Sequence, residues 1–124
     1  MGNVMVSSDT PADQMLSAEV SSVPVVIYST TTCPYCVKAK RLLEVEDIDF
    51  KSVELNKLGE LRPEYAKALL KLTGQRTVPQ VFICGNWIGG YKELQDLAFA
   101  KQLHNLLAQC RTRSDYSDGL KRSS

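Results

Sequence analysis

The chain has 124 residues, of which 44% are hydrophobic, and a formal net charge of +1. This length suits one domain with a single core, and the balanced charge argues against a nucleic-acid or anionic-membrane partner. No stretch reaches the roughly 20 apolar residues of a membrane span. A transit or signal peptide would carry basic residues, but no Lys or Arg precedes Lys38. We therefore expect a soluble, monomeric, cytoplasmic protein.

The first helix is predicted just after a short leading segment. Residues 1–9 show no apolar period, and we expect them to form a flexible extension. Thr10 can cap a helix, Pro11 suits its first position, and Asp13 stands where a capping box places its acidic residue. Pro24 then ends the helix, because proline cannot continue it.

A buried strand followed by a helix is predicted next. The run Val25–Tyr28 is continuously apolar, which is typical of a strand buried on both faces at the centre of a layered sheet. The strand ends before Cys33, and a helical period runs from Pro34 to about Val45. The side chains expected to face inward from this helix are Val37, Leu42 and Leu43.

A second strand and a third helix follow. Residues 48–55 alternate between apolar and polar side chains, which predicts a strand. Residues 64–72 have a helical period, and Gly74 can end the helix. The inward face of that helix is expected to carry Tyr65, Leu69 and Leu72.

The last part of the domain is predicted to be a hairpin and one long helix. A third strand covers residues 81–84, and Gly85-Asn86 forms a tight turn into a short fourth strand at Trp87-Ile88. A helical pattern then covers residues 93–109 without a break, with leucines on its inward face.

The order of these elements indicates the α/β class. The first two strands are joined through a helix and should be parallel, whereas the last two form an antiparallel hairpin. We therefore expect a four-stranded mixed sheet flanked by helices, in one domain over residues 10–110. Residues 111–124 are polar and should form a flexible tail.

The motif Cys33-Pro34-Tyr35-Cys36 lies where the first strand gives way to a helix. The unpaired N–H groups and the dipole at a helix N-terminus stabilise a thiolate, so Cys33 is the predicted nucleophile. Cys36, nearly one turn further on, can attack a mixed disulfide formed on Cys33. The alternative is a buried thiol pair or a disulfide without a catalytic role, but a disulfide across so short a loop would constrain the unfolded chain very little.

The remaining cysteines and the histidine do not indicate a metal site or a structural disulfide. A zinc site would need all four cysteines or His104, the only histidine, at spacings that no common zinc module uses, so we expect no metal. Cys84 lies in an apolar run and is predicted to be a small core residue, and Cys110 is predicted to be a spare thiol. Because no secretory signal is evident, we do not expect a disulfide framework.

Three motifs together resemble the glutaredoxin family: CPYC at residues 33–36, TVPQVFI at 77–83 and IGGY at 88–91. The resemblance covers residues 20–109. It implies a thioredoxin-like fold and a glutathione-dependent thiol–disulfide oxidoreductase, which reduces protein disulfides and protein–glutathione mixed disulfides. Glutathione would be a co-substrate, and no resident metal is implied.

The resemblance also implies a binding site for glutathione. The Val78-Pro79 bond should be cis, leaving the backbone groups of Val78 free to pair with an extended substrate. Gly89-Gly90 would let a ligand approach the backbone at a helix N-terminus. The implied contact residues, with Arg76 at the glycine end and residues 91–93 at the γ-glutamyl end, are Tyr35, Arg76, Thr77, Val78, Pro79, Gly90, Tyr91, Lys92 and Glu93.

Two other functions remain open. Some glutaredoxins hold a [2Fe–2S] cluster between two subunits through the first cysteine and glutathione, although members that do so usually have a smaller residue at the place of Pro34. Alternatively, the sheet edge near Val78 could dock a partner under redox control without turnover.

Overall fold

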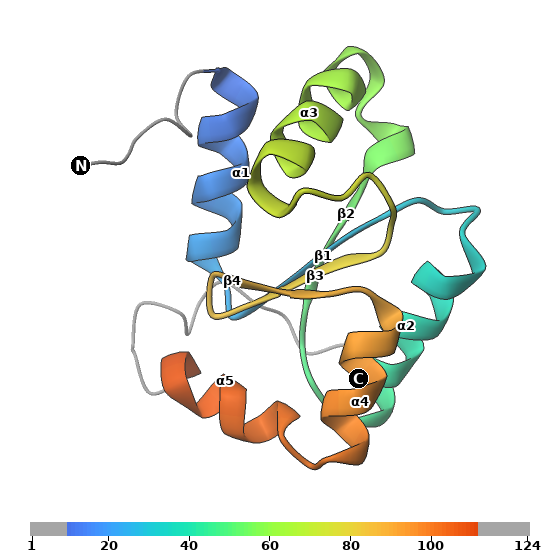
Figure 1. Cartoon of the computed structure of the whole chain (residues 1–124), viewed down its shortest axis with the longest axis vertical. Helices are drawn as coiled ribbons and strands as arrows, with labels where there is room; N and C mark the ends of the chain where they lie inside the picture. Colours follow the sequence, from blue (N-terminus) through green and yellow to red (C-terminus); the bar gives the residue numbers. More distant parts are fainter. Residues whose placement is uncertain (1–9, 112–124) are drawn as a thin grey trace.

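The computed structural model describes residues 10–111 and contains a four-stranded sheet between two layers of helices (Figure 1). The helices and strands are α1 (Pro11–Ser22), β1 (Val25–Ser29), α2 (Pro34–Val45), β2 (Lys51–Glu54), α3 (Arg62–Thr73), β3 (Gln80–Ile83), β4 (Asn86–Gly89), α4 (Tyr91–Phe99) and α5 (Leu103–Arg111). Two short 3-10 turns, Leu55–Lys57 and Gly59–Leu61, connect β2 to α3. The predicted flexible extension 1–9 and nearly all of the predicted tail lie outside the described residues.

The sheet confirms the predicted mixed topology. Its strand order is β2-β1-β3-β4, with β1 parallel to β2 and antiparallel to β3, and β3 antiparallel to β4. Within the described residues no helix is long and apolar enough to cross a membrane.

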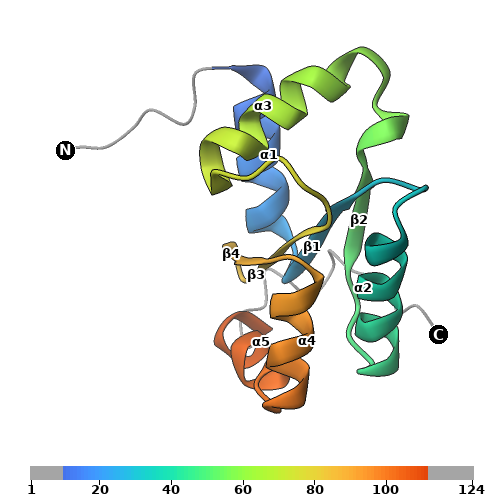
Figure 2. The ribbon, with the colours of Figure 1, turned by 45° about the vertical axis from the view of Figure 1, so that its right-hand side comes forward.

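The central strand β1 is buried along its whole length because helices cover both of its faces. Val26 and Tyr28 point into a core shared with α1 and α3. Val25 and Ile27 point into a second core shared with α2, α4 and α5. Figures 1 and 2 show the same division, with α1 and α3 on one side of the sheet and the other three helices on the opposite side.

The local signals at the helix ends are confirmed. Thr10 and Asp13 form a reciprocal capping box at the start of α1, in which the Asp13 N–H donates to Thr10 Oγ1 at 3.0 Å. Gly74 ends α3 in the left-handed conformation, with φ of +76°.

The predicted inward orientation of two side chains was wrong. Val37 and Leu72 are 45% and 49% exposed. In α2 the buried face instead contains Cys36, Ala39 and Leu43, which is the face turned toward the sheet. The predicted strand 48–55 is also shorter, because only Lys51–Glu54 pairs with β1.

The predicted continuous helix over residues 93–109 is wrong. α4 ends at Phe99, and Lys101 adopts a left-handed conformation with φ of +59°. The Gln102 N–H donates to the Leu97 carbonyl at 2.9 Å, which closes the turn, and the chain resumes as α5 at Leu103. This reversal lets Leu103 and Leu107 join the core beneath the sheet.

The hairpin turn and the two remaining cysteines also differ from the prediction. Cys84 and Gly85, with φ of +52° and +82°, form the turn, and Asn86 is already in β4. Positive φ at both central residues is the type I′ geometry that matches the twist of paired strands. Cys84 is bonded to Cys110 at the end of α5, with an S–S distance of 2.02 Å. The prediction of a core thiol and a spare thiol was therefore wrong, because the reversal at Lys101 carries α5 back to the turn.

Candidate active site

Cys33 occupies the N-cap of α2, directly after the loop that follows β1. Its backbone is extended, with φ of −90° and ψ of 117°, and Pro34 takes the first helical position. The Cys36 N–H donates to the Cys33 sulfur at 3.2 Å. A backbone donor at a helix N-terminus stabilises negative charge on that sulfur. The position is therefore suited to a nucleophilic thiolate, as the sequence predicted.

Cys36 is fully buried against the sheet, and Cys33 is partly exposed beside it. Burial first, and then a hydrogen bond with the adjacent Cys33 sulfur and the charge of that sulfur, raise the pKa of the Cys36 thiol to about 12. The Thr30 backbone and the Lys40 charge act in the opposite direction. At neutral pH the pair thus consists of the accessible Cys33 sulfur and, behind it, the buried Cys36 thiol, which remains protonated.

An open groove of about 360 Å³ lies next to Cys33. Its lining comes from the start of α2, the loop before β3 and the start of α4, and consists of Tyr35, Gln75, Thr77, Val78, Pro79, Gly90, Tyr91, Lys92 and Glu93. The Val78-Pro79 bond is cis, and the Val78 carbonyl lies 3.7 Å from the Cys33 sulfur. The groove therefore leads to the Cys33 sulfur.

One end of the groove is built on two glycines. Gly89 has φ of +121°, which favours glycine, and a Cβ atom on Gly90 would lie 3.2 Å from the Pro79 carbonyl. Gly90 is the N-cap of α4, and its N–H donates to the Glu93 carboxylate at 2.8 Å. The absence of side chains lets the end of β4 approach the Pro79 loop closely.

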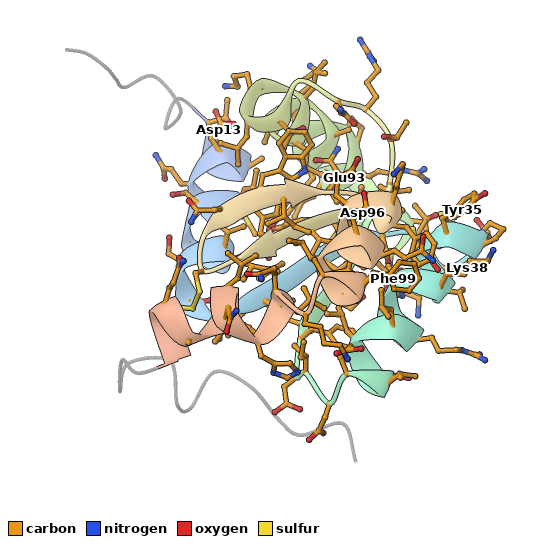
Figure 3. All side chains as sticks on the ribbon, turned by 60° about the horizontal axis from the view of Figure 1, so that its bottom comes forward. Asp13, Tyr35, Lys38, Glu93, Asp96 and Phe99 are labelled. Carbon is orange, nitrogen blue, oxygen red and sulfur yellow. A yellow bond between two sulfur atoms is a disulfide. The ribbon has the colours of Figure 1, made fainter. Side chains whose placement is uncertain are left out.

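Two tyrosines form the wall between α2 and α4. The rings of Tyr35 and Tyr91 are 5.8 Å apart, and the Lys38 ammonium lies 5.1 Å from the Tyr35 ring centre. Figure 3 shows Tyr35 and Lys38 together on α2, beside α4 with its labelled Phe99. The wall combines aromatic surface with positive charge.

A family model described as glutaredoxin matches residues 25–88, which contain the cysteine pair and most of the groove. The chain belongs to the glutaredoxin family. Its architecture is accordingly the thioredoxin-like fold that the resemblance implied.

Curated relatives agree with this assignment. The mitochondrial glutaredoxin-2 of Mus musculus is 38% identical over 104 residues, which are 84% of this chain and 65% of the relative. The Bos taurus protein of the same name is 36% identical, over 97% of this chain and 78% of the relative. The chloroplastic glutaredoxin-C5 of Arabidopsis thaliana is 37% identical, over 85% and 60%. This glutaredoxin thus spans less than two thirds of the length of several such relatives.

Solved structures show the same fold. The holo form of glutaredoxin C1 from Populus tremula x tremuloides has a TM-score of 0.76 at 36% identity, covering 81% of this chain and 98% of that one. The buckwheat glutaredoxin–glutathione complex has a TM-score of 0.76 at 35% identity, covering 80% and 89%.

The groove brings together every predicted glutathione contact of this glutaredoxin except Arg76. Arg76 is exposed and is not part of the lining, whereas its neighbour Gln75 is. No local pattern in the sequence distinguishes Gln75. Gln80 was also missed: its buried side-chain amide donates to the carbonyls of Gln75 and Thr77, both at 2.9 Å, and holds the loop that forms the groove.

Within residues 10–111, no three His, Cys, Asp or Glu side chains form a group that could hold a metal ion. The expectation of no resident metal stays a prediction.

Proposed function

We propose that this chain is a glutathione-dependent thiol–disulfide oxidoreductase that reduces protein disulfides and protein–glutathione mixed disulfides. The observation that carries the proposal is the helix-capping Cys33, backed by the buried Cys36 and opening onto the groove. Family membership supports the same chemistry.

The proposed reaction with a glutathionylated protein proceeds in two exchanges. The Cys33 thiolate attacks the glutathione sulfur, the mixed S–S bond breaks, and the protein thiolate leaves and takes up a proton. A second glutathione thiolate then attacks the Cys33–glutathione bond, releasing oxidised glutathione and regenerating Cys33. With a protein disulfide, Cys33 forms the first mixed disulfide and Cys36 resolves it.

The groove supplies the groups that a peptide such as glutathione needs. The exposed backbone at Val78 can pair with it as an added strand. Because Glu93 already accepts the Gly90 N–H, the next N–H groups of α4, at Tyr91 and Lys92, remain for the γ-glutamyl carboxylate. The buckwheat relative was solved as a glutathione complex, which supports glutathione as the ligand. Arg76 is proposed for the glycine carboxylate from its place beside the groove.

The function is tested by following NADPH loss with glutathione, glutathione reductase and a small glutathione mixed disulfide. Cys33→Ser should abolish turnover, because no other sulfur in the site caps the helix. Cys36→Ser should retain much of it, because free glutathione can resolve the intermediate. Cys36→Ser as inactive as Cys33→Ser, or wild type without turnover, would refute the proposed route.

We also propose a cytoplasmic monomer, although the curated names of several relatives place them in mitochondria or chloroplasts. Light scattering of the purified chain and fractionation of cells that express the full-length gene test the two parts separately. No observation on the described residues specifically supports the cluster-carrier hypothesis or the docking hypothesis.

A further inference from the structure

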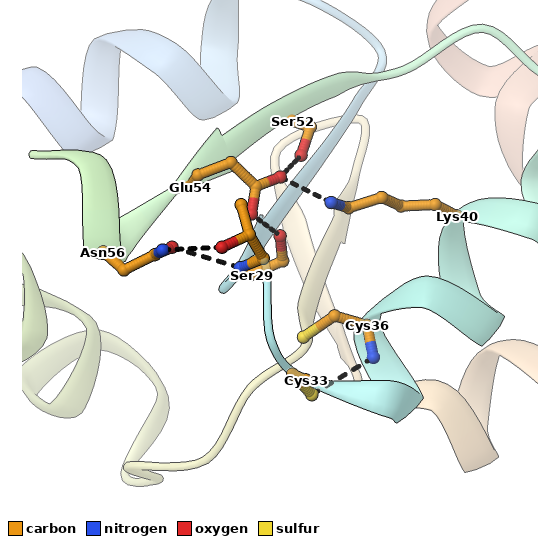
Figure 4. Close-up of polar contacts among 8 residues, drawn as sticks. Ser29, Cys33, Cys36, Lys40, Ser52, Glu54 and Asn56 are labelled. Atoms are coloured by element: carbon orange, nitrogen blue, oxygen red, sulfur yellow. Dashed lines mark hydrogen bonds and ion pairs between the residues drawn. The ribbon is translucent and has the colours of Figure 1, made fainter.

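An ion pair lies directly behind the resolving cysteine. Cys36 and Lys40 are one turn apart on α2, so their side chains lie on the same face of the helix. Cys36 is fully buried, and the Lys40 side chain is 24% exposed. Figure 4 shows both side chains leaving α2 toward the ends of β1 and β2.

Glu54, at the end of β2, holds Lys40 in this place. The Lys40 ammonium donates to Glu54 Oε2 at 2.5 Å, and the Ser52 hydroxyl donates to the same oxygen at 2.5 Å. The fully buried Ser29 donates to Oε1 at 2.6 Å. Burial opposes ionisation of Glu54, but the hydrogen bonds from Lys40, Ser29 and Ser52 outweigh it and lower the pKa of the carboxyl. The carboxylate is therefore ionised and fixes the ammonium.

Cys36 needs such a charge once Cys33 has reacted. A buried thiol attacks only as the thiolate, and burial raises the pKa of Cys36. When Cys33 is bonded to glutathione, its negative charge is gone and no longer opposes ionisation of Cys36. Lys40 is then the one charged side chain that favours the Cys36 thiolate among the groups acting on it.

The two tyrosines of the neighbouring elements β1 and α4 each have other partners. On the β1 side, the Tyr28 hydroxyl donates to Glu19 of α1 and faces the opposite core. From α4, Tyr91 packs on Tyr35 at the groove. Glu54 partly offsets the Lys40 charge, but it also keeps the ammonium from turning out to solvent.

We propose that Lys40, anchored by Glu54, is a positioning residue for the resolving step, in which its ammonium stabilises the Cys36 thiolate. This inference rests on the proposed function. The Cys36 sulfur attacks the Cys33 sulfur, the Cys33–glutathione bond breaks, and the Cys33–Cys36 bond forms. The proton lost by Cys36 passes to solvent, and the departing glutathione thiolate takes one up there.

Both exchanges can be followed in one experiment. The reduced protein is mixed with oxidised glutathione, quenched with acid at increasing times, and separated by mass into reduced, glutathionylated and internally disulfide-bonded forms. Formation of the glutathionylated form reports on Cys33, and its decay to the internal disulfide reports on Cys36. The experiment is repeated from acidic to alkaline pH.

Lys40→Gln is the informative variant, because its amide can still donate to Glu54 while the charge is lost. The ratio of the second rate to the first should fall about tenfold at neutral pH, which corresponds to about one unit in the pKa of Cys36. The pH profile of the second step should move upward by the same amount. Lys40→Arg should restore both, and Arg41→Gln, which removes an exposed charge from the same helix away from the groove wall, should leave the second step as in wild type.

An unchanged ratio and pH profile in Lys40→Gln would overturn the proposal, as would an equal effect of Arg41→Gln. If Lys40→Gln fails to fold, Lys40→Met replaces it. If wild type forms no glutathionylated species, the proposed function fails instead. The role of Lys40 is then decided by carbon-13 NMR titration of Cys36 in a Cys33→Ser background with and without Lys40→Gln, where an equal midpoint refutes it.

Discussion

Removing the bond between Cys84 and Cys110 should destabilise the fold by about 3.5 kcal/mol. The two residues are 26 apart in the sequence. The chain-entropy relation for a loop of that length gives about 12 cal/mol/K, which is about 3.5 kcal/mol at 25 °C. With an unfolding entropy of about 2.1 cal/mol/K per residue over roughly 100 folded residues, the melting temperature should fall by about 17 °C.

The measurement uses a Cys36→Ser background, in which no active-site disulfide can form. Cys84→Ser, Cys110→Ser and the double variant are compared with the parent by thermal and urea unfolding. Each single variant breaks the same bond, so each should lose as much stability as the double variant. In the unreduced, denatured parent, Cys33 alone should react with a thiol reagent.

A reductant provides the matched control. It should lower the melting temperature of the Cys36→Ser parent to that of the variants and leave the variants unchanged. Two small and additive losses for Cys84→Ser and Cys110→Ser, with no effect of reductant on the parent, would show that the sulfurs are not bonded in solution. The loop-entropy argument would then not apply to this chain.

Three further predictions concern the capping box, the buried tyrosines and the glycine pair. The hydrogen bond from Lys71, opposed by burial, lowers the pKa of Asp13. Ionisation of Asp13 therefore stabilises the fold above the unfolded pKa of about 3.8, and this stabilisation is lost as the pH falls through the lower pKa of the folded protein. Asp13→Asn should cost about 1–2 kcal/mol at neutral pH, and urea titrations should show this difference closing in acid; a constant difference contradicts the assignment. Tyr65→Phe removes the hydroxyl that donates to Glu19 at 3.1 Å and should cost about 1–2 kcal/mol by urea unfolding, whereas an unchanged midpoint would mean that Glu19 rebonds elsewhere. Gly89→Ala places a Cβ atom 2.6 Å from Glu93 Cγ at φ of +121°. We expect it to lower the free energy of unfolding by about 1–3 kcal/mol and to raise the KM for glutathione. Wild-type values for both would refute the need for glycine.

The parts of the fold that the sequence predicted depend on neighbouring residues. The capping box at Thr10 and Asp13 and the end of α3 at Gly74 each involve a few consecutive positions, where side-chain chemistry and backbone conformation decide the outcome. The buried run Val25–Tyr28 likewise identified the central strand. The placement of Cys33 at the N-cap followed from that strand and the helical period after Pro34.

The parts that the sequence did not predict depend on long-range packing. No glycine or proline marks the reversal between α4 and α5, where Lys101 takes a left-handed conformation because α5 packs back on the sheet. The bond between Cys84 and Cys110 depends on that reversal. Within the site, the contribution of Gln75 depends on Gln80, whose buried amide fixes the loop.

The two edges of the sheet have a consequence for how the protein behaves at high concentration. Each edge strand, β2 and β4, is only four residues long, and β2 begins with the exposed Lys51 and Ser52. Both edges are short, so they offer an incoming chain few backbone partners, and the lysine on β2 further opposes such pairing. Growth of the sheet from one molecule into the next is therefore disfavoured, while the most apolar strand, β1, stays enclosed between its neighbours.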